Sequence, residues 1–165
     1  MMFTQNEVNN RGKLRAKLFL SFLGATFGAN LALAHHNDRH ISGPISATLT
    51  HIIDGDTIGV VLTPWLYTSV RTNVRIAGID TPEIRRPKCE EERAKGHLAV
   101  EHITQLLGAG DDTPAIVLTN MIPDKFGGRV VAHVQTLNGV NLAQSLLDAG
   151  LAQPYDGGTK PLWCD

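Results

Sequence analysis

The sequence predicts a mainly β, α+β domain whose core is a small closed barrel of five strands. Three observations support this: five short β-like segments, two hairpin turn signals, and one long helical pattern between the third and fourth strands. The aromatic content is only 5%, so Val, Ile, Leu and Ala must fill the barrel interior. A five-stranded barrel with elements in this order is typical of the OB fold.

The first half of the domain carries three of the expected strands, over residues 46–53, 57–62 and 73–79. Asp54-Gly55 is a hairpin turn signal between the first strand and the second. Thr63-Pro64 is expected to end the second strand, with a loop from there to Arg71. Prolines after the third strand exclude regular structure in the charged segment that follows.

The second half is expected to begin with a helix over residues 90–107, which Gly108 ends. Its predicted apolar stripe consists of Ala94, Leu98, Ile103, Leu106 and Leu107. Two strands are expected next, over 115–119 and 129–137, and Asn138-Gly139 is a second hairpin signal. Asn141 should cap a short helix that ends at Gly150, and the tail from Pro154 to Asp165 is expected to be irregular.

Residues 1–34 have the pattern of a secretory signal peptide. A basic region precedes an apolar run that ends in Ala32-Leu33-Ala34, which fits cleavage after Ala34. We therefore expect a periplasmic or secreted protein, with a flexible segment over 35–44 and one domain over 45–165. The alternative is an uncleaved inner-membrane anchor, although the apolar run is short for a membrane-spanning helix.

Cleavage after Ala34 would change the charge of the chain. The segment holds four of the 15 basic residues and one of the 16 acidic residues, so 11 basic and 15 acidic residues are left, a net charge of −4. Proteins that hold nucleic acid by bulk electrostatics are usually basic. The composition thus argues against an architectural DNA binder and favours a local site for any nucleic-acid contact.

The chain has two cysteines, Cys89 and Cys164, both in the part expected to be exported. An even number of cysteines in an oxidising compartment favours a disulfide. The alternative is a pair of free thiols.

Two short clusters and a third segment hold the residue types that phosphodiester hydrolysis requires. Carboxylates can bind a hard cation, guanidinium groups can hold phosphate oxygens, and a further carboxylate can orient or deprotonate water. The candidates for these roles are Asp56, Asp80, Glu83, Arg75 and Arg129. The sequence has neither a Cys/His pattern for zinc nor a Walker loop.

Each cluster by itself also has a purely structural interpretation, as a turn, a helix start or a solvated strand end. Strict strand alternation would also place Arg75 and Asp80 on opposite faces. We expect Gly78, which lies between them, to host a bulge that redirects the second side chain. The functional interpretation therefore depends on the combination of segments.

That combination resembles the staphylococcal nuclease (thermonuclease) family over about residues 45–155. The resemblance is carried by Asp54-Gly55-Asp56-Thr57, by the run from Val74 to Glu83, and by Asp124-Lys125-Phe126-Gly127-Gly128-Arg129. It implies an OB-fold, calcium-dependent nuclease that cuts DNA and RNA without sugar specificity and leaves 3′-phosphates. Single-stranded or frayed nucleic acid would be the favoured substrate, no stable protein partner is implied, and a monomer is expected.

The resemblance also implies roles for individual residues. Asp56 and Asp80 would bind calcium through their carboxylates, and Thr81 through its backbone carbonyl. Glu83 would position or deprotonate the attacking water, while Arg75 and Arg129 would clamp the phosphate. These assignments, together with nucleotide contacts by Lys125 and Tyr155, are carried over from the family pattern.

The chain departs from that pattern in two places. The glycine before Arg129 is doubled, which could shift this arginine along its strand. The long third helix of the family is expected to be absent, and a bridge from Cys89 to Cys164 could instead pin the tail to the charged loop. Two alternatives to a nuclease stay open: a non-catalytic OB-fold module that binds nucleic acid, and a carrier of calcium or another ligand.

Overall fold

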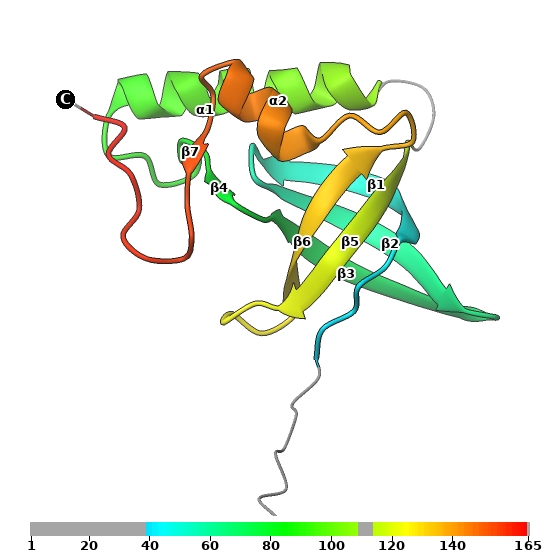
Figure 1. Ribbon diagram of the computed structural model, residues 1–165. Coiled ribbons are helices and arrows are strands. Elements are labelled where there is room, and N and C mark those ends of the chain that lie inside the picture. Colours follow the sequence, from blue (N-terminus) through cyan, green and yellow to red (C-terminus); the bar gives the residue numbers. More distant parts are fainter. Residues whose placement is uncertain (1–38, 109–113, 165) are drawn as a thin grey trace, which may run out of the picture. The chain divides into compact units, whose positions relative to one another are not determined.

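The computed structural model describes residues 39–108 and 114–164, and it confirms the predicted five-stranded barrel. The expected signal peptide and the first part of the expected flexible segment lie outside the described residues. Closure follows the order β1-β2-β3-β6-β5 (Figure 1). The barrel strands are β1 (Ile45–Asp54), β2 (Thr57–Trp65), β3 (Thr68–Ile76), β5 (Ala115–Pro123) and β6 (Arg129–Thr136).

The strand pairing explains how distant segments of the chain meet. All barrel neighbours are antiparallel except β3 and β6, which run parallel and close the barrel. Both helices, α1 (Glu90–Leu107) and α2 (Leu142–Asp148), lie at one end of the barrel, as Figure 1 shows. Neither helix in the described part of the chain is long and apolar enough to cross a membrane.

A single apolar core fills the barrel and the layer beneath the helices. As the composition indicated, its fully buried side chains are aliphatic, among them Ile58, Val74, Ile103, Leu118 and Leu146. Complete burial of a side chain of this size contributes about 1.5–3 kcal/mol to folding. This core holds the strand ends that carry the polar side chains described below.

The predicted loop after Thr63 is wrong. β2 continues to Trp65 and β3 begins at Thr68, so the two strands form one long hairpin. The pairing register shifts between Leu62 and Trp65. Pro64 lies at this shift, and because proline has no N–H it interrupts the ladder without ending the strand.

The third strand also ends earlier than predicted. β3 stops at Ile76, the chain turns at Gly78 with φ +83°, and the short strand β4 (Ile79–Asp80) follows. The bulge expected at Gly78 is therefore a full turn. Part of the tail is also more regular than expected, because β7 (Gln153–Pro154) pairs antiparallel with β4.

Helix α1 buries a different face from the predicted one. Ile103 and Leu107 are buried as expected, but Ala94 and Leu98 are exposed. The first half of the buried face consists of Glu92, Gly96 and Ala99. The apolar pattern missed this face because Glu92 is charged and Gly96 and Ala99 are small. The two small residues allow α1 to approach the loop over residues 82–84 and the turn at Gly55 closely.

Both helices have the caps that the sequence indicated. Gly108 ends α1 in the left-handed conformation with φ 61°, and the Asn141 side chain accepts a hydrogen bond from Gln144 N at the start of α2. Cys89 is the N-cap of α1. Residues 39–44 precede the barrel as an exposed segment, in which Ile41 forms an isolated bridge to Met121.

Candidate active site

The site begins at Asp56, which is buried in the turn between β1 and β2. Its Oδ1 accepts a hydrogen bond from Thr57 Oγ1 at 2.9 Å, and its Oδ2 accepts one from Thr81 N at 3.1 Å. Gly55 is needed in this turn because a Cβ there would lie 2.6 Å from Ala99 Cβ. Helix α1 therefore presses directly on the turn that presents Asp56.

Arg75 joins the two predicted metal-binding carboxylates. Its Nη1 pairs with Asp56 Oδ1 at 2.5 Å and its Nη2 with Asp80 Oδ1 at 3.1 Å. Nη2 also donates to the Ile79 carbonyl at 3.0 Å. Burial by itself would lower the pKa of Arg75, but the charges and hydrogen bonds of both aspartates raise it. The turn at Gly78 thus brings Arg75 and Asp80 together, as the sequence required.

Asp80 is almost completely buried, with 1% of its surface exposed. Besides Arg75, its Oδ1 pairs with Lys160 Nζ at 2.8 Å, and its Oδ2 accepts a hydrogen bond from Trp163 Nε1 at 3.3 Å. Burial would lower the pKa of Lys160, but the hydrogen bond and charge of Asp80 raise it. Lys160 and Trp163 could not be predicted from the sequence, because they lie in a tail with no recognisable pattern.

Asp54 completes an acidic group around the turn. Burial raises the pKa of its carboxyl to about 7, and the neighbouring charge of Asp56 adds to the shift. The Asp56 backbone N–H donates to Asp54 Oδ1 at 3.2 Å. Asp54 belongs to the Asp54-Gly55-Asp56-Thr57 motif, but no role was predicted for it from the sequence. Its position two residues from Asp56 in a tight turn is the signal that could have identified it as part of the site.

Glu83 is half-buried on the loop that follows β4. Its Oε1 accepts a hydrogen bond from Arg85 N at 3.0 Å. The buried Glu92 holds the loop from below, because its carboxylate accepts from Glu83 N at 3.3 Å and from Lys88 N at 2.6 Å. Glu92 was also missed in the sequence, where it reads as an ordinary acidic residue in the first turn of a helix.

Gly96 lets helix α1 approach this loop. A Cβ at Gly96 would lie 2.8 Å from Ile84 Cγ1 and 2.9 Å from the Pro82 carbonyl oxygen. The Pro82 backbone and the Ile84 side chain, on either side of Glu83, therefore pack closely against the helix at Gly96.

The doubled glycine does not remove Arg129 from the site. Gly128, with φ +79°, takes up the extra residue in the turn between β5 and β6. In the parallel ladder, Arg129 pairs with Asn73 while Val131 pairs with Arg75. Because residues two apart on a strand share a face, Arg129 lies on the same side of the sheet as Arg75.

Arg129 is held by its own hairpin. Its Nε donates to Asp124 Oδ2 at 2.6 Å, and its guanidinium lies over the Phe126 ring at 5.4 Å. Burial would raise the pKa of Asp124, but the hydrogen bond from Arg129 lowers it. Lys125 also lies over the Phe126 ring, at 5.6 Å.

These side chains gather around one hollow of about 1230 Å³, whose lining runs from the β1–β2 turn to the β5–β6 hairpin. Its lining includes the predicted residues Asp56, Arg75, Thr81, Glu83, Lys125, Arg129 and Tyr155. The Tyr155 ring lies 5.4 Å from the Arg75 guanidinium, and its hydroxyl donates to the Gly158 carbonyl. Asp80 lies behind this lining, with Arg75 and Lys160 on its carboxylate.

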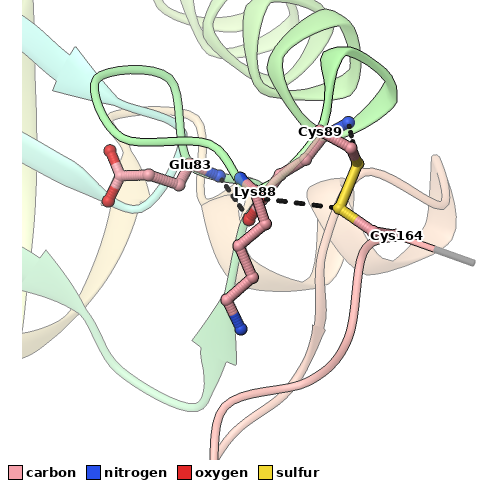
Figure 2. The surroundings of a disulfide bond; sticks show 5 residues. Glu83, Lys88, Cys89 and Cys164 are labelled. Carbon is pink, nitrogen blue, oxygen red and sulfur yellow. Dashed lines mark hydrogen bonds between the residues drawn. A yellow bond between two sulfur atoms is a disulfide. The ribbon is translucent and has the colours of Figure 1, made fainter.

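The predicted disulfide between Cys89 and Cys164 is confirmed, with an S–S distance of 2.09 Å. Figure 2 shows that it joins the start of α1 to the end of the chain, while the Glu83 carboxylate points away from it. Cys164 Sγ lies 4.0 Å from Glu92 Oε2, the carboxylate that holds the Glu83 loop. The bridge therefore pins the tail beside the loop that carries Glu83.

Comparison with protein-family models matches residues 73–161 to the family described as staphylococcal nuclease homologue. The chain belongs to this family. The matched range begins within β3 and contains Arg75, the Glu83 loop and the Arg129 hairpin. A search of curated proteins finds no match to the chain. Membership of the staphylococcal nuclease homologue family indicates a nuclease-type hydrolase with nucleic acid as its substrate class, in agreement with the resemblance.

Proposed function

We propose that this protein is a calcium-dependent, sugar-nonspecific endonuclease that hydrolyses phosphodiester bonds of DNA and RNA and leaves 3′-phosphates. The observation that carries this proposal is the convergence of Arg75, Glu83 and Arg129 on one hollow beside the linked carboxylates of Asp56 and Asp80. These groups come from three separate segments of the chain, residues 54–57, 74–83 and 124–129. Together they supply a cation site, two phosphate clamps and a base.

The donor set fits a calcium ion. Asp56 and Asp80 offer carboxylate oxygens close enough to share one guanidinium, and the Thr81 carbonyl follows directly in the chain. Among the described residues, no group of three or more His, Cys, Asp or Glu is arranged to hold a metal. Under this proposal the ligands beyond the two carboxylates and the Thr81 carbonyl would be water and substrate oxygens.

Bound at Asp56, Asp80 and Thr81, the ion would polarise the phosphoryl oxygens. Arg75 and Arg129 bind the phosphate from two neighbouring strands and stabilise the charge that builds on it. Because Asp124 holds Arg129 Nε, the terminal nitrogens of this guanidinium are the ones that contact phosphate. Glu83 orients the attacking water and accepts its proton.

The surroundings of the hollow suit a polyanion. A second hollow of about 420 Å³ shares Asp54, Thr57, Glu83 and Arg129 with the first, and its lining adds Arg85 and Arg86. Lys125 and Tyr155 line the first hollow and would contact the nucleotides on either side. The exposed cations lie on a chain with a net charge of −4 after signal cleavage, so binding is expected to be local and to favour single-stranded or frayed substrate.

A cleavage assay tests the proposal. The mature protein should degrade denatured DNA in calcium, and excess EDTA should abolish the activity. Asp80→Asn and Glu83→Gln should lower the rate at least about 100-fold, whereas Asp148→Asn and Glu91→Gln, exposed acids elsewhere in the chain, should leave it unchanged. A pure preparation that binds single-stranded DNA but never cuts it would instead identify a non-catalytic OB-fold module.

We also propose that the protein is exported to the periplasm or secreted after cleavage behind Ala34. The disulfide supports this, because such bonds persist in oxidising compartments. Fractionation and N-terminal sequencing of the native protein should find it outside the cytoplasm, beginning at His35. Recovery of the intact chain from the inner membrane would establish the anchored alternative.

A further inference from the structure

The last part of the chain, residues 155–164, covers the buried carboxylate of Asp80. Two side chains of this segment contact it from different directions: Lys160 Nζ reaches Oδ1 at 2.8 Å, and Trp163 Nε1 donates to Oδ2 at 3.3 Å. The contacts have different character. Lys160 is a cation with 55% of its side chain exposed, whereas Trp163 is partly buried and offers a neutral N–H.

The segment is held at both ends. At its start, Gln153 in β7 pairs with Asp80 itself in β4, and Tyr155 N donates to the Gly78 carbonyl at 3.0 Å. At its end, the disulfide fixes Cys164 to the first residue before α1. Figure 1 shows the segment leaving β7, looping outward and returning to the beginning of α1. We call residues 155–164 the strap. Because the strap is anchored next to β7 at one end and by the disulfide at the other, it holds Trp163 and Lys160 against Asp80.

We propose that Trp163 is a positioning residue for the metal ligand Asp80, that Lys160 competes with the metal for the same carboxylate, and that the disulfide holds both in place. This inference rests on the proposed calcium-dependent function. Hydrogen bonds to a ligating carboxylate orient it and raise metal affinity. The Trp163 N–H fixes the orientation of the Asp80 carboxylate through Oδ2, and it adds no charge. Lys160 Nζ, like Arg75 Nη2, holds a positive charge against Oδ1, and removal of the lysine charge therefore favours a metal at this carboxylate.

The two contacts therefore have opposite effects on calcium affinity. Measured by isothermal titration of the mature protein with calcium alone, Trp163→Phe should weaken binding about 10-fold, since loss of an outer partner costs about 10- to 100-fold. Lys160→Gln should tighten binding several-fold. Trp65→Phe is the matched control, because this tryptophan is 75% exposed at the tip of the β2–β3 hairpin and should change nothing.

The role of the disulfide is tested by a double-mutant cycle. Replacing both cysteines by serine removes the bridge but keeps a good N-cap at position 89, because serine is favoured there. In that background the effects of Trp163→Phe and Lys160→Gln on calcium affinity should largely disappear. Effects of the same size with and without the bridge would overturn the strap.

A metal-free measurement tests the contact itself. In the NMR spectrum of the protein in EDTA, Asp80→Asn should shift the indole N–H resonance of Trp163 and leave that of Trp65 in place. Unchanged Trp163 resonance would overturn the inference whatever the activity. If Trp163→Phe unfolds the protein, the exposed Lys160 still provides the test, because its substitution should tighten binding.

The outcomes separate this inference from the proposed function. Calcium binding and cleavage by the intact protein, together with unchanged calcium affinity in both tail variants, would overturn the inference and leave the nuclease proposal standing. An intact protein that neither binds calcium nor cuts would overturn both. Opposite shifts in affinity, lost with the disulfide, would establish the strap.

Discussion

The two arginines of the hollow are held in different ways. Arg75 bridges carboxylates from the β1–β2 turn and from β4, and only 12% of its side chain is exposed. Arg129 pairs with Asp124 from its own hairpin, five residues away, and 25% of its side chain is exposed. Arg75 thus joins parts of the fold, whereas Arg129 is a local unit attached to the barrel. Substitution of the two arginines should therefore lower the free energy of unfolding by different amounts, even if both side chains act on the same phosphate.

Replacement of each arginine by glutamine gives the largest expected effects. Both variants should lose at least about 100-fold in kcat/KM, because each removes a phosphate clamp. Arg75→Gln should also lower the free energy of unfolding by about 3 kcal/mol, since it removes the cation paired with the buried Asp56 and one of the two cations paired with Asp80. Arg129→Gln should lower it by less than about 1 kcal/mol. Activity assays and urea unfolding in EDTA check this, and equal losses of stability would contradict the comparison.

The acids beside the two arginines should respond to pH with opposite signs. The pKa of Asp54 is raised to about 7, so the folded state favours its protonated form. Its contribution to stability is complete below about pH 4 and is lost as pH rises from there through about 7, a change on the order of 4 kcal/mol. In EDTA, the stability of the wild type relative to Asp54→Asn should therefore fall over this range.

Asp124 provides the opposite case on the Arg129 side. Burial raises its pKa, but the hydrogen bond and charge of Arg129, together with the backbone N–H groups of Phe126 and Lys125, outweigh burial and lower it. Its contribution is present above the ordinary aspartate pKa and is lost as pH falls below it. The wild type should therefore be more stable than Asp124→Asn near neutral pH, and this difference in the free energy of unfolding should disappear in acid. If the stability difference changed with pH in the same direction for wild type and Asp54→Asn as for wild type and Asp124→Asn, the two carboxylates would have similar environments.

Close packing of α1 should matter for the Arg75 side of the hollow. Gly96→Ala gains helix propensity but places a Cβ against the Pro82 carbonyl. We expect a net loss of about 1–2 kcal/mol in unfolding free energy, with a fall in activity as the Glu83 loop shifts. Lys95→Ala, at the exposed neighbouring position, should be neutral in both. A Gly96→Ala variant that is more stable than the wild type would show that the loop around Glu83 moves away from the added Cβ at little energetic cost.

The doubled glycine gives the smallest effect, on the Arg129 side. Gly128→Ala should lower the free energy of unfolding by about 1 kcal/mol, because φ at this residue is +79°. Gly127→Ala should be nearly neutral, since a Cβ there meets no atom within 4 Å. Thermal unfolding compares the two, and equal effects would place the strain elsewhere in the turn.

Much of the fold was predictable because its signals are local. Strand alternation, the Asn141 cap and the Gly108 stop lie within a few residues of what they determine. The errors arose where tertiary packing overrode a local pattern. Pro64 stays inside a strand pair at a register shift, and α1 buries Gly96 and Ala99 instead of Ala94 and Leu98.

The sequence by itself determined the chemistry available to the site, since Asp56, Arg75, Asp80, Glu83 and Arg129 all belong to recognisable motifs. Only the tertiary structure decided how they meet. The register that pairs Thr57 with Arg75, and the parallel pairing of β3 with β6, bring the motifs to one end of the barrel. The contact of Trp163 with Asp80 joins residues 83 positions apart, and no local pattern records it. Such contacts arise only when the folded chain brings distant segments side by side.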